Sequence, residues 1–175
     1  MIMRKTERLI IILALLTLSI SATAQDIPNN EIWYTSYDNQ IVQPFQTDVF
    51  GATIISNTYS DGKGVIKFDG NVTSIGYDAF AGATLKTITM PNSVTSIGEN
   101  AFAKCTTLES VMIPHSVISI GDVAFADCQS LTSVSIPNSV KGIGASAFRD
   151  CYSLTNVFVI SLNTILLFSF RSSSN

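Results

Sequence analysis

The side chains of this chain that could do chemistry are few, and their spacing does not assemble a catalytic set. The only histidine, His115, follows Pro114 in an expected turn, where sibling segments carry asparagine. Without a second base, the abundant serines lack a partner for nucleophilic catalysis. The carboxylates Asp122, Asp127 and Asp150 are expected to cap or flank turns at the surface. We therefore expect no enzyme, no catalytic residue and no cofactor.

Three cysteines recur at one fixed spacing. Cys105, Cys128 and Cys151 lie 23 residues apart, so stacked repeats would place them in a ladder. The sheet spacing of about 4.8 Å suits the Cα atoms of a disulfide, but parallel side chains do not suit its dihedral angle. A linear ladder also lacks the tetrahedral arrangement that zinc requires. We expect three buried free thiols that pack as small hydrophobic groups, and no metal site.

The apolar residues follow the same 23-residue spacing, and a shorter copy of the unit begins at Val72. A fixed period of roughly 20–50 residues is typical of a solenoid, a stack of similar coils. One coil buries about six large apolar side chains, which does not offset the entropy cost of ordering its backbone. Each coil therefore needs its neighbours. The recurring residues are Val94, Val117 and Val140 together with Phe102, Phe125 and Phe148.

Residues 108–125 show the elements expected in one coil. Residues 108–113 alternate as a short strand, and Pro114 ends it because proline cannot donate to a ladder. Gly121 gives a turn, and Asp122 is expected to cap a single helical turn. The fold class that follows is a β-dominated α/β solenoid of about four coils.

Composition divides the chain into four segments. Residues 1–24 begin with three basic side chains, continue with an apolar run too short for a stable span, and end in a small-x-small pattern. They are expected to be a cleaved signal peptide, with an uncleaved anchor as the alternative. We expect residues 25–63 to form a β-rich cap, residues 64–160 the repeats and residues 161–175 a divergent tail. The product would be secreted, periplasmic or at the cell surface, and not integral to the membrane.

The two ends of the repeat stack differ in their expected closure. At the N-terminal end, five aromatic residues are expected to cover the first coil, with carbohydrate binding as the alternative. At the other end, Ile160 stands where the pattern has proline. The segment after it is either a capping strand or a truncation product, and we favour truncation. This end is also the expected site of self-association. The five aromatic residues are Trp33, Tyr34, Phe45, Phe50 and Tyr59.

The charge balance excludes one class of partner. The chain has 10 basic and 13 acidic residues, a formal net charge of −3, and three of the basic residues lie in the expected signal peptide. No basic stripe remains to neutralise phosphates, so we expect no binding to nucleic acid.

The run from Leu108 to Cys128 resembles the BspA-type leucine-rich repeat. Its Ile-Pro, Ser-Val-x-x-Ile-Gly and Ala-Phe-x-x-Cys elements recur in order, and the resemblance covers about residues 64–160. It implies a right-handed solenoid with one parallel sheet along a concave face. It also implies an exported protein of host-associated bacteria, whose relatives act as surface adhesins towards host matrix proteins or other microbes.

The outward strand positions are the candidate ligand-binding residues. They form a flat, neutral, hydroxyl-rich surface that suits an extended peptide or glycan, and the alternative is a solvated surface without a partner. We expect an exported leucine-rich-repeat module for adhesion, or for protein or glycan interaction; the alternative is a truncated, non-binding fragment of a longer adhesin. One row is Thr87, Ser110, Ser133 and Asn156, and the other is Thr89, Met112, Ser135 and Phe158.

Overall fold

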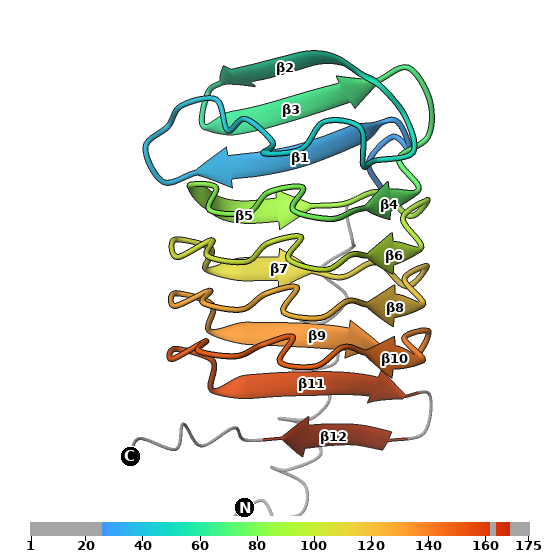
Figure 1. The fold of residues 1–175 in the computed structure, drawn as a ribbon, viewed down its shortest axis with the longest axis vertical. Coiled ribbons are helices and arrows are strands. Elements are labelled where there is room, and N and C mark those ends of the chain that lie inside the picture. The colour runs from blue at the N-terminus through green and yellow to red at the C-terminus, as the bar shows by residue number, and fades with distance from the viewer. Residues whose placement is uncertain (1–25, 162–163, 169–175) are drawn as a thin grey trace, which may run out of the picture.

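The computed structural model describes residues 26–161 and 164–168, which form a short β-solenoid of about four coils (Figure 1). An eight-stranded sheet runs along the whole stack, and a four-stranded sheet of two-residue strands lies at one side of it. This confirms the solenoid expected from the 23-residue period. The strands are β1 (Glu31–Ser36), β2 (Ile54–Ser60), β3 (Lys63–Phe68), β4 (Ser74–Ile75), β5 (Leu85–Thr89), β6 (Ser96–Ile97), β7 (Ser110–Met112), β8 (Ser119–Ile120), β9 (Ser133–Pro137), β10 (Gly142–Ile143), β11 (Asn156–Ser161) and β12 (Thr164–Phe168).

The expected signal peptide lies outside the described residues, as do residues 162–163 and 169–175 of the expected tail. Within the described part of the chain, no helix is long and apolar enough to cross a bilayer.

The repeat strands pair in parallel and in register with the sequence period. Strands β5, β7, β9 and β11 are successive neighbours in the eight-stranded sheet. Ile88 pairs with Val111, Val111 with Val134, and Val134 with Val157. All four side chains are buried, so alternation within each strand turns one face of this sheet towards the core.

The prediction of a helical turn after Gly121 is wrong, because none of the described residues is helical. In each coil, two residues of this segment instead adopt a positive φ, as Asn100 (57°) and Lys104 (62°) do in the second coil. Their backbone N–H groups then donate to the next coil, at 3.1 Å to the carbonyl of Asp122 and 2.8 Å to that of Ala126. The N–H groups between them bond within the segment, as that of Ala103 does to the carbonyl of Asn100 at 2.9 Å.

Asp122 has a different role from the helix cap that was expected. Its Oδ1 accepts a hydrogen bond of 2.7 Å from the backbone N–H of Ala145, which belongs to the following coil. The carboxylate therefore links two coils across the stack.

A ladder of phenylalanine rings fills the centre of the stack. The ring centroids of Phe80 and Phe102 lie 5.6 Å apart, those of Phe102 and Phe125 5.1 Å, and those of Phe125 and Phe148 5.2 Å, all nearly parallel. The first three rings are fully buried. Phe50 continues the ladder into the N-terminal cap, with its ring edge-on to Phe80 at 5.6 Å.

The N-terminal cap is antiparallel. Strands β2 and β3 form a hairpin, as the turn residues Asp61 and Gly62 predict, and β1 lies between β3 and β5, antiparallel to both. The Tyr34 hydroxyl donates to Asn57 Oδ1 at 2.9 Å beneath this sheet. The Tyr34 ring occupies the space where a side chain at Gly64 would lie, since an added Cβ would approach the ring to 2.0 Å.

The five cap aromatics do not all cover the first coil. Tyr34 and Phe50 are buried as expected, and Tyr59 packs partly buried against the core. The expectation is wrong for Phe45, which is 66% exposed. It is also wrong for Trp33, which lies half-buried on the opposite, solvent-facing side of the sheet.

The loop between β1 and β2 closes the N-terminal end of the stack by hydrogen bonds. The N–H of Phe45 donates to the carbonyl of Ala79 at 2.9 Å, and the N–H of Gly76 donates to the carbonyl of Val49 at 2.9 Å. The N–H of Thr73 donates to the carbonyl of Phe50 at 3.0 Å. The backbone of the first coil thus has partners on the side where no earlier coil exists.

At the C-terminal end, the segment that departs from the repeat pattern forms an edge strand. β12 pairs antiparallel with β11, from Ser161 opposite Thr164 to Val157 opposite Phe168. The eight-stranded sheet therefore ends in an antiparallel strand on both sides.

The centre of the phenylalanine ladder should dominate stability. We expect Phe125→Ala to lower the free energy of unfolding by about 3–5 kcal/mol, because it leaves a cavity between two stacked rings. Phe148→Ala is the matched control, and should cost less because that ring is only half-buried. Chemical denaturation of both variants measures this, and a loss below about 1 kcal/mol for Phe125→Ala would contradict the packing.

One turn residue is poorly suited to its backbone conformation. Val123 has a φ of 48°, where sibling coils place Asp78, Asn100 and Ser146. A β-branched side chain in this region costs roughly 1–2 kcal/mol. Val123→Asn should therefore raise the free energy of unfolding by about 1 kcal/mol, and Asn100→Val should lower it by a similar amount. Equal effects of the two substitutions in thermal unfolding would contradict this interpretation.

Candidate binding surface

The eight candidate residues lie together on the solvent-facing side of the eight-stranded sheet. Register pairs Thr87 with Ser110, Ser110 with Ser133, and Ser133 with Asn156 in one row. The second row pairs the remaining four in the same way. Ser110 and Met112 are exposed, Met112 at 49%, and the other six are half-buried.

Strand β1 extends both rows into the cap. Thr35 lies opposite Thr87, with 2.8 Å between their Oγ1 atoms, and Trp33 lies opposite Thr89. On the far side of β1, Val65 of β3 lies opposite Trp33. We call these three residues and the eight candidates the outer face.

The sequence period did not reveal Trp33 as a surface residue, because β1 is not a repeat strand and runs antiparallel. The available signal was the alternation within residues 31–36. Ile32 and Tyr34 are buried, so their neighbour Trp33 points to the other side.

Polar neighbours hold the Trp33 side chain in place. The Lys63 ammonium lies 3.0 Å from the centroid of the Trp33 ring, a cation–π contact. The indole Nε1 donates to Glu31 Oε2 at 2.6 Å, and Glu31 Oε1 lies 3.2 Å from Lys67 Nζ. Burial opposes ionisation, but the bonds from Trp33 and Lys67 outweigh it and hold the pKa of Glu31 below its usual value.

The remaining charges beside the rows also lie near partners. Lys86 Nζ lies 3.7 Å from Glu109 Oε1 at the starts of β5 and β7, with both side chains about half exposed. The outer face is therefore close to neutral, with hydroxyls along it and Trp33, Met112 and Phe158 as its large apolar groups. Such a surface does not select a strongly charged partner.

The repeats of this chain match those of a known protein family. A family model described as a BspA type leucine-rich repeat region of six copies matches residues 52–175. The chain belongs to the BspA-type leucine-rich repeat family. This confirms the resemblance found in the sequence, and a repeat fold of this kind suggests a protein-interaction module. Repeat proteins of this family are typically non-enzymatic and surface-associated.

Solved structures of bacterial leucine-rich repeat proteins are similar to this one. A protein from Bacteroides capillosus ATCC 29799 is 27% identical with a TM-score of 0.51, and the match covers 77% of this chain and 97% of that chain. The T. pallidum leucine-rich repeat protein is 32% identical with a TM-score of 0.44, over 52% of this chain and 54% of that one. A Bacteroides ovatus ATCC 8483 protein is 33% identical with a TM-score of 0.41, over 57% and 30%. The match thus spans about half of the T. pallidum protein and about a third of the Bacteroides ovatus protein. No curated protein matches this chain.

The cysteines of the BspA-type repeats are free thiols, as expected, and serve packing. Each donates to the carbonyl of a phenylalanine in the preceding coil: Cys105 to Phe80 at 3.0 Å, and Cys128 to Phe102 at 3.2 Å. Cys151 makes the same bond but is only half-buried, so the expectation of three buried thiols is wrong for this one. Burial raises the pKa of Cys105 to about 12, and the Cys151 thiol together with burial raises that of Cys128.

No other chemistry-bearing cluster forms in the described part of the chain. His115 is exposed in its turn, as expected. Among residues 26–161 and 164–168, no three His, Cys, Asp or Glu side chains meet to hold a metal ion.

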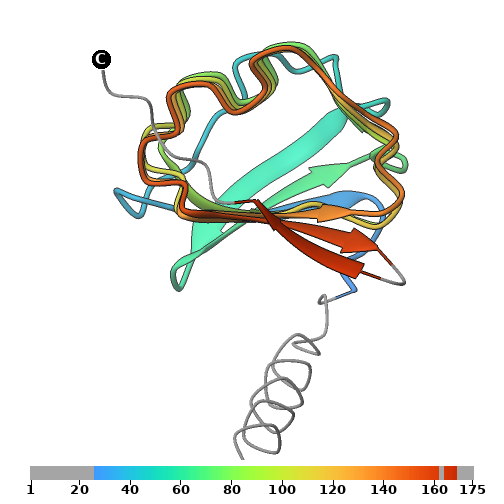
Figure 2. The same cartoon turned by 90° about the horizontal axis from the view of Figure 1, so that it is seen from below.

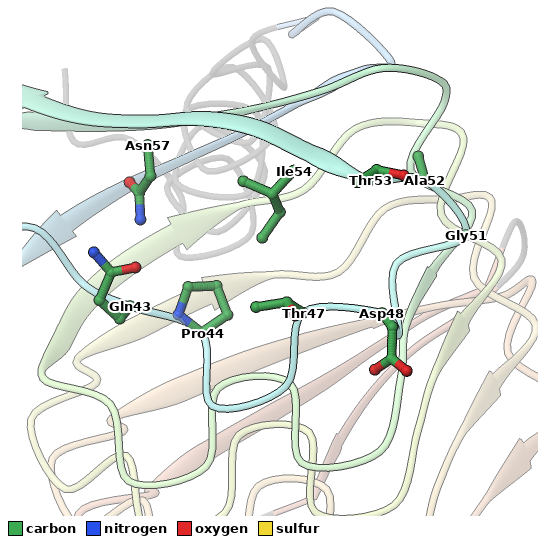
Figure 3. Close-up of a pocket in the computed structure, with 9 residues that line it drawn as sticks. All are labelled: Gln43, Pro44, Thr47, Asp48, Gly51, Ala52, Thr53, Ile54 and Asn57. Carbon is green, nitrogen blue, oxygen red and sulfur yellow. The ribbon is translucent and has the colours of Figure 1, made fainter.

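A hollow of about 590 Å³ lies in the cap between β2 and the preceding loop (Figure 3). Asn57 in its wall is already committed, since its Nδ2 donates to the Val42 carbonyl and its Oδ1 accepts from Tyr34. The wall contains one carboxylate and no histidine, cysteine or lysine, so it offers no acid–base pair. The lining residues are Gln43, Pro44, Thr47, Asp48, Gly51, Ala52, Thr53, Ile54 and Asn57.

Alkaline pH should destabilise the fold through Cys105. The unfolded thiol ionises above about pH 8.5, whereas the native thiol keeps its proton until about pH 12. Its contribution is therefore complete below the unfolded pKa and is lost as the pH rises through the folded one. We expect the free energy of unfolding to fall by about 1.4 kcal/mol per pH unit in this window from this thiol.

Denaturation between pH 8 and 11, followed by the fluorescence of Trp33, measures this slope. Cys105→Ala is the control, because it removes this titration and leaves the tyrosines and the other thiols in place. Equal slopes for the two proteins would contradict the assignment.

Proposed function

We propose that this chain is an exported binding module that holds an extended segment of a partner protein on its outer face. The observation that carries the proposal is the continuity of the two rows. They run from Thr35 and Trp33 in the cap through four repeat strands, so one polypeptide segment crossing the strands would contact every coil.

The chemistry of the rows favours an extended, weakly charged polypeptide. Strands lie about 4.8 Å apart and an extended chain rises about 3.3 Å per residue, so a segment laid across the strands passes a new row position about every one and a half residues. The hydroxyls there can bond to some of its peptide groups. Trp33 and Met112 supply the apolar contact. Tryptophan is enriched among residues that dominate binding energy, and the bonds from Trp33 to Lys63 and Glu31 reduce the entropy lost when a ligand immobilises the ring.

Two further features support an adhesive role outside the cytoplasm. The first 24 residues have the pattern of a signal peptide, and the family is typically surface-associated. The partners that fit are host matrix proteins or proteins of other microbial surfaces. A small face with few large side chains implies modest affinity, so adhesion would depend on many copies acting together.

The anchors of the outer face should decide binding. We expect Trp33→Ala and Met112→Ala each to weaken binding to a matrix protein such as fibrinogen or fibronectin by about 5- to 30-fold. Ile118→Ala is the matched control, because Ile118 is 47% exposed, as Met112 is at 49%, but lies outside the eight-stranded sheet. Surface plasmon resonance on immobilised protein measures this, with thermal unfolding to show that each variant is folded.

Three outcomes would contradict the proposal. The first is an equal loss of binding in the Ile118 variant, which would place the ligand elsewhere. The second is retention on a glycan array without binding to any protein of the panel, which would make the ligand a carbohydrate. Absence of both kinds of binding would favour the alternative of a non-binding fragment.

A further inference from the structure

The two rows of the outer face continue past β1 towards the N-terminal edge of the eight-stranded sheet (Figure 1). Val65 of β3 lies opposite Trp33, and the two strands are antiparallel. The next outward residue of β3, Lys63, therefore continues the row of Thr35, and it lies opposite Ser60 of β2. A segment that crosses the strands passes Lys63 as well.

Lys63 brings the only charge into the two rows. Every other outward residue of these rows, from β2 to β11, has a hydroxyl, an amide or an apolar side chain. The ion pairs among the described residues involve other basic side chains, although Lys63 is exposed. Its ammonium instead lies 3.0 Å from the centroid of the Trp33 ring, which holds it on the outer face. This ammonium is therefore free to meet an anionic group of a ligand.

The neighbouring carboxylate, Glu31, is already bound by other donors. Its Oε2 accepts from the Trp33 indole at 2.6 Å, and its Oε1 lies 3.2 Å from Lys67 Nζ. The outward positions of β1 and β3 thus carry two ammonium groups and one carboxylate. The chain as a whole has a formal net charge of −3, so this end of the outer face is a local excess of positive charge. Such an excess attracts an anionic group.

Two donors meet at this charge. Directly opposite residues of an antiparallel pair have Cβ atoms about 4.5–5.5 Å apart, so the exposed Ser60 hydroxyl and the Lys63 ammonium can reach one anion. The two oxygens of a carboxylate accept bonds of this kind. We propose that Lys63 and Ser60 form a carboxylate site, and that the bound partner segment carries an acidic side chain there. This inference rests on the function proposed above and names one group of its ligand.

The position of the carboxylate site favours an acidic side chain over the free end of a chain. Lys63 lies on β3, and β2 lies beyond it at the edge of the sheet. Thr58 and Ser60 of β2 are exposed, so a bound segment has a further strand to lie on after it passes Lys63. Seen along the stack, the turn between β2 and β3 projects beyond the repeat strands on the side of the outer face (Figure 2). The partner segment therefore need not end at Lys63.

The sheet also sets the distance from the carboxylate site to Met112, the nearest large apolar group of the repeats. Because the Lys63 ammonium lies over the Trp33 ring, it stands in the row of Met112. From β3 to β7 there are three strand steps, about 14 Å in all. Four residues of an extended chain span about 13 Å, and side chains at this interval point to the same side. We therefore expect a large apolar residue about four positions from the acidic residue of the partner segment.

Peptide binding to the full chain tests the carboxylate site, and Trp33, its only tryptophan, gives the fluorescence signal. The probe is a peptide of about nine residues, serine and threonine except for one leucine and one glutamate about four positions apart, blocked at both ends and made in both orders. The reference peptide has glutamine in place of glutamate. We expect the glutamate peptide to bind about three- to fivefold more tightly at low salt. This preference should disappear near about 1 M salt, where the screening length is about 3 Å.

Variants assign the preference to Lys63. Lys63→Gln should remove it, and Lys63→Arg should keep it because the positive charge remains. Lys104→Gln is the matched control, since it removes the same charge from an exposed turn outside both sheets. Ser60→Ala should reduce the preference by about twofold. Thermal unfolding shows whether each variant is folded, and binding of the glutamine peptide shows whether its outer face is intact.

The outcomes separate the carboxylate site from the proposed function. Equal binding of the glutamate and glutamine peptides overturns the site but leaves the outer face as a binding surface. Loss of the preference in the Lys104 variant also overturns it, because the effect would then be one of overall charge. A peptide without glutamate but with a free C-terminal carboxylate that binds as tightly as the glutamate peptide overturns the assignment to a side chain. Absence of binding by every peptide contradicts the proposed function, and this inference with it.

Discussion

The close approach of successive coils is the constraint on which the rest of the structure depends. At the turn after β8, an added Cβ on Gly121 would lie 2.5 Å from the backbone nitrogen of Glu99 in the preceding coil, so only glycine fits there. The same approach brings neighbouring phenylalanine rings to between 5.1 and 5.6 Å and backbone groups to 2.8 Å. Each coil satisfies its polar backbone and covers its apolar side chains through its neighbours. The stability of such a stack is a sum over interfaces rather than over coils.

This constraint explains which parts of the fold could be predicted from the sequence. Inward positions such as Val111 and Phe125 recur because each must match the identical position above and below it, so the period alone identifies them. The turns could not be predicted in this way. A segment beginning at Asp122 has the local chemistry of a helix cap. Its carboxylate and every second backbone N–H bond to the adjacent coil instead, and that choice depends on the stack.

The outer face shows the same division between repeated and inserted parts. Residues such as Ser110 and Ser133 could be placed from alternation and spacing, because parallel strands with a common period keep a common register. Strand β1 comes from outside the repeats and enters between β3 and β5. Its position is set by long-range pairing, so the sequence suggested a covering role for Trp33, and the structure instead makes it part of the surface. Tryptophan is a residue type enriched among those that dominate binding energy, and the tryptophan of the outer face is thus the residue that the period could not locate.

The two ends of the stack differ because a coil has two sides and a strand covers only one. At the N-terminal end, β1 pairs with β5 within the eight-stranded sheet, and the loop around Val49 bonds to the other side of the first coil. At the C-terminal end, β12 supplies the first kind of cover, and the described residues supply nothing equivalent beside β10. The uncovered surface faces along the stack, whereas the outer face points across it.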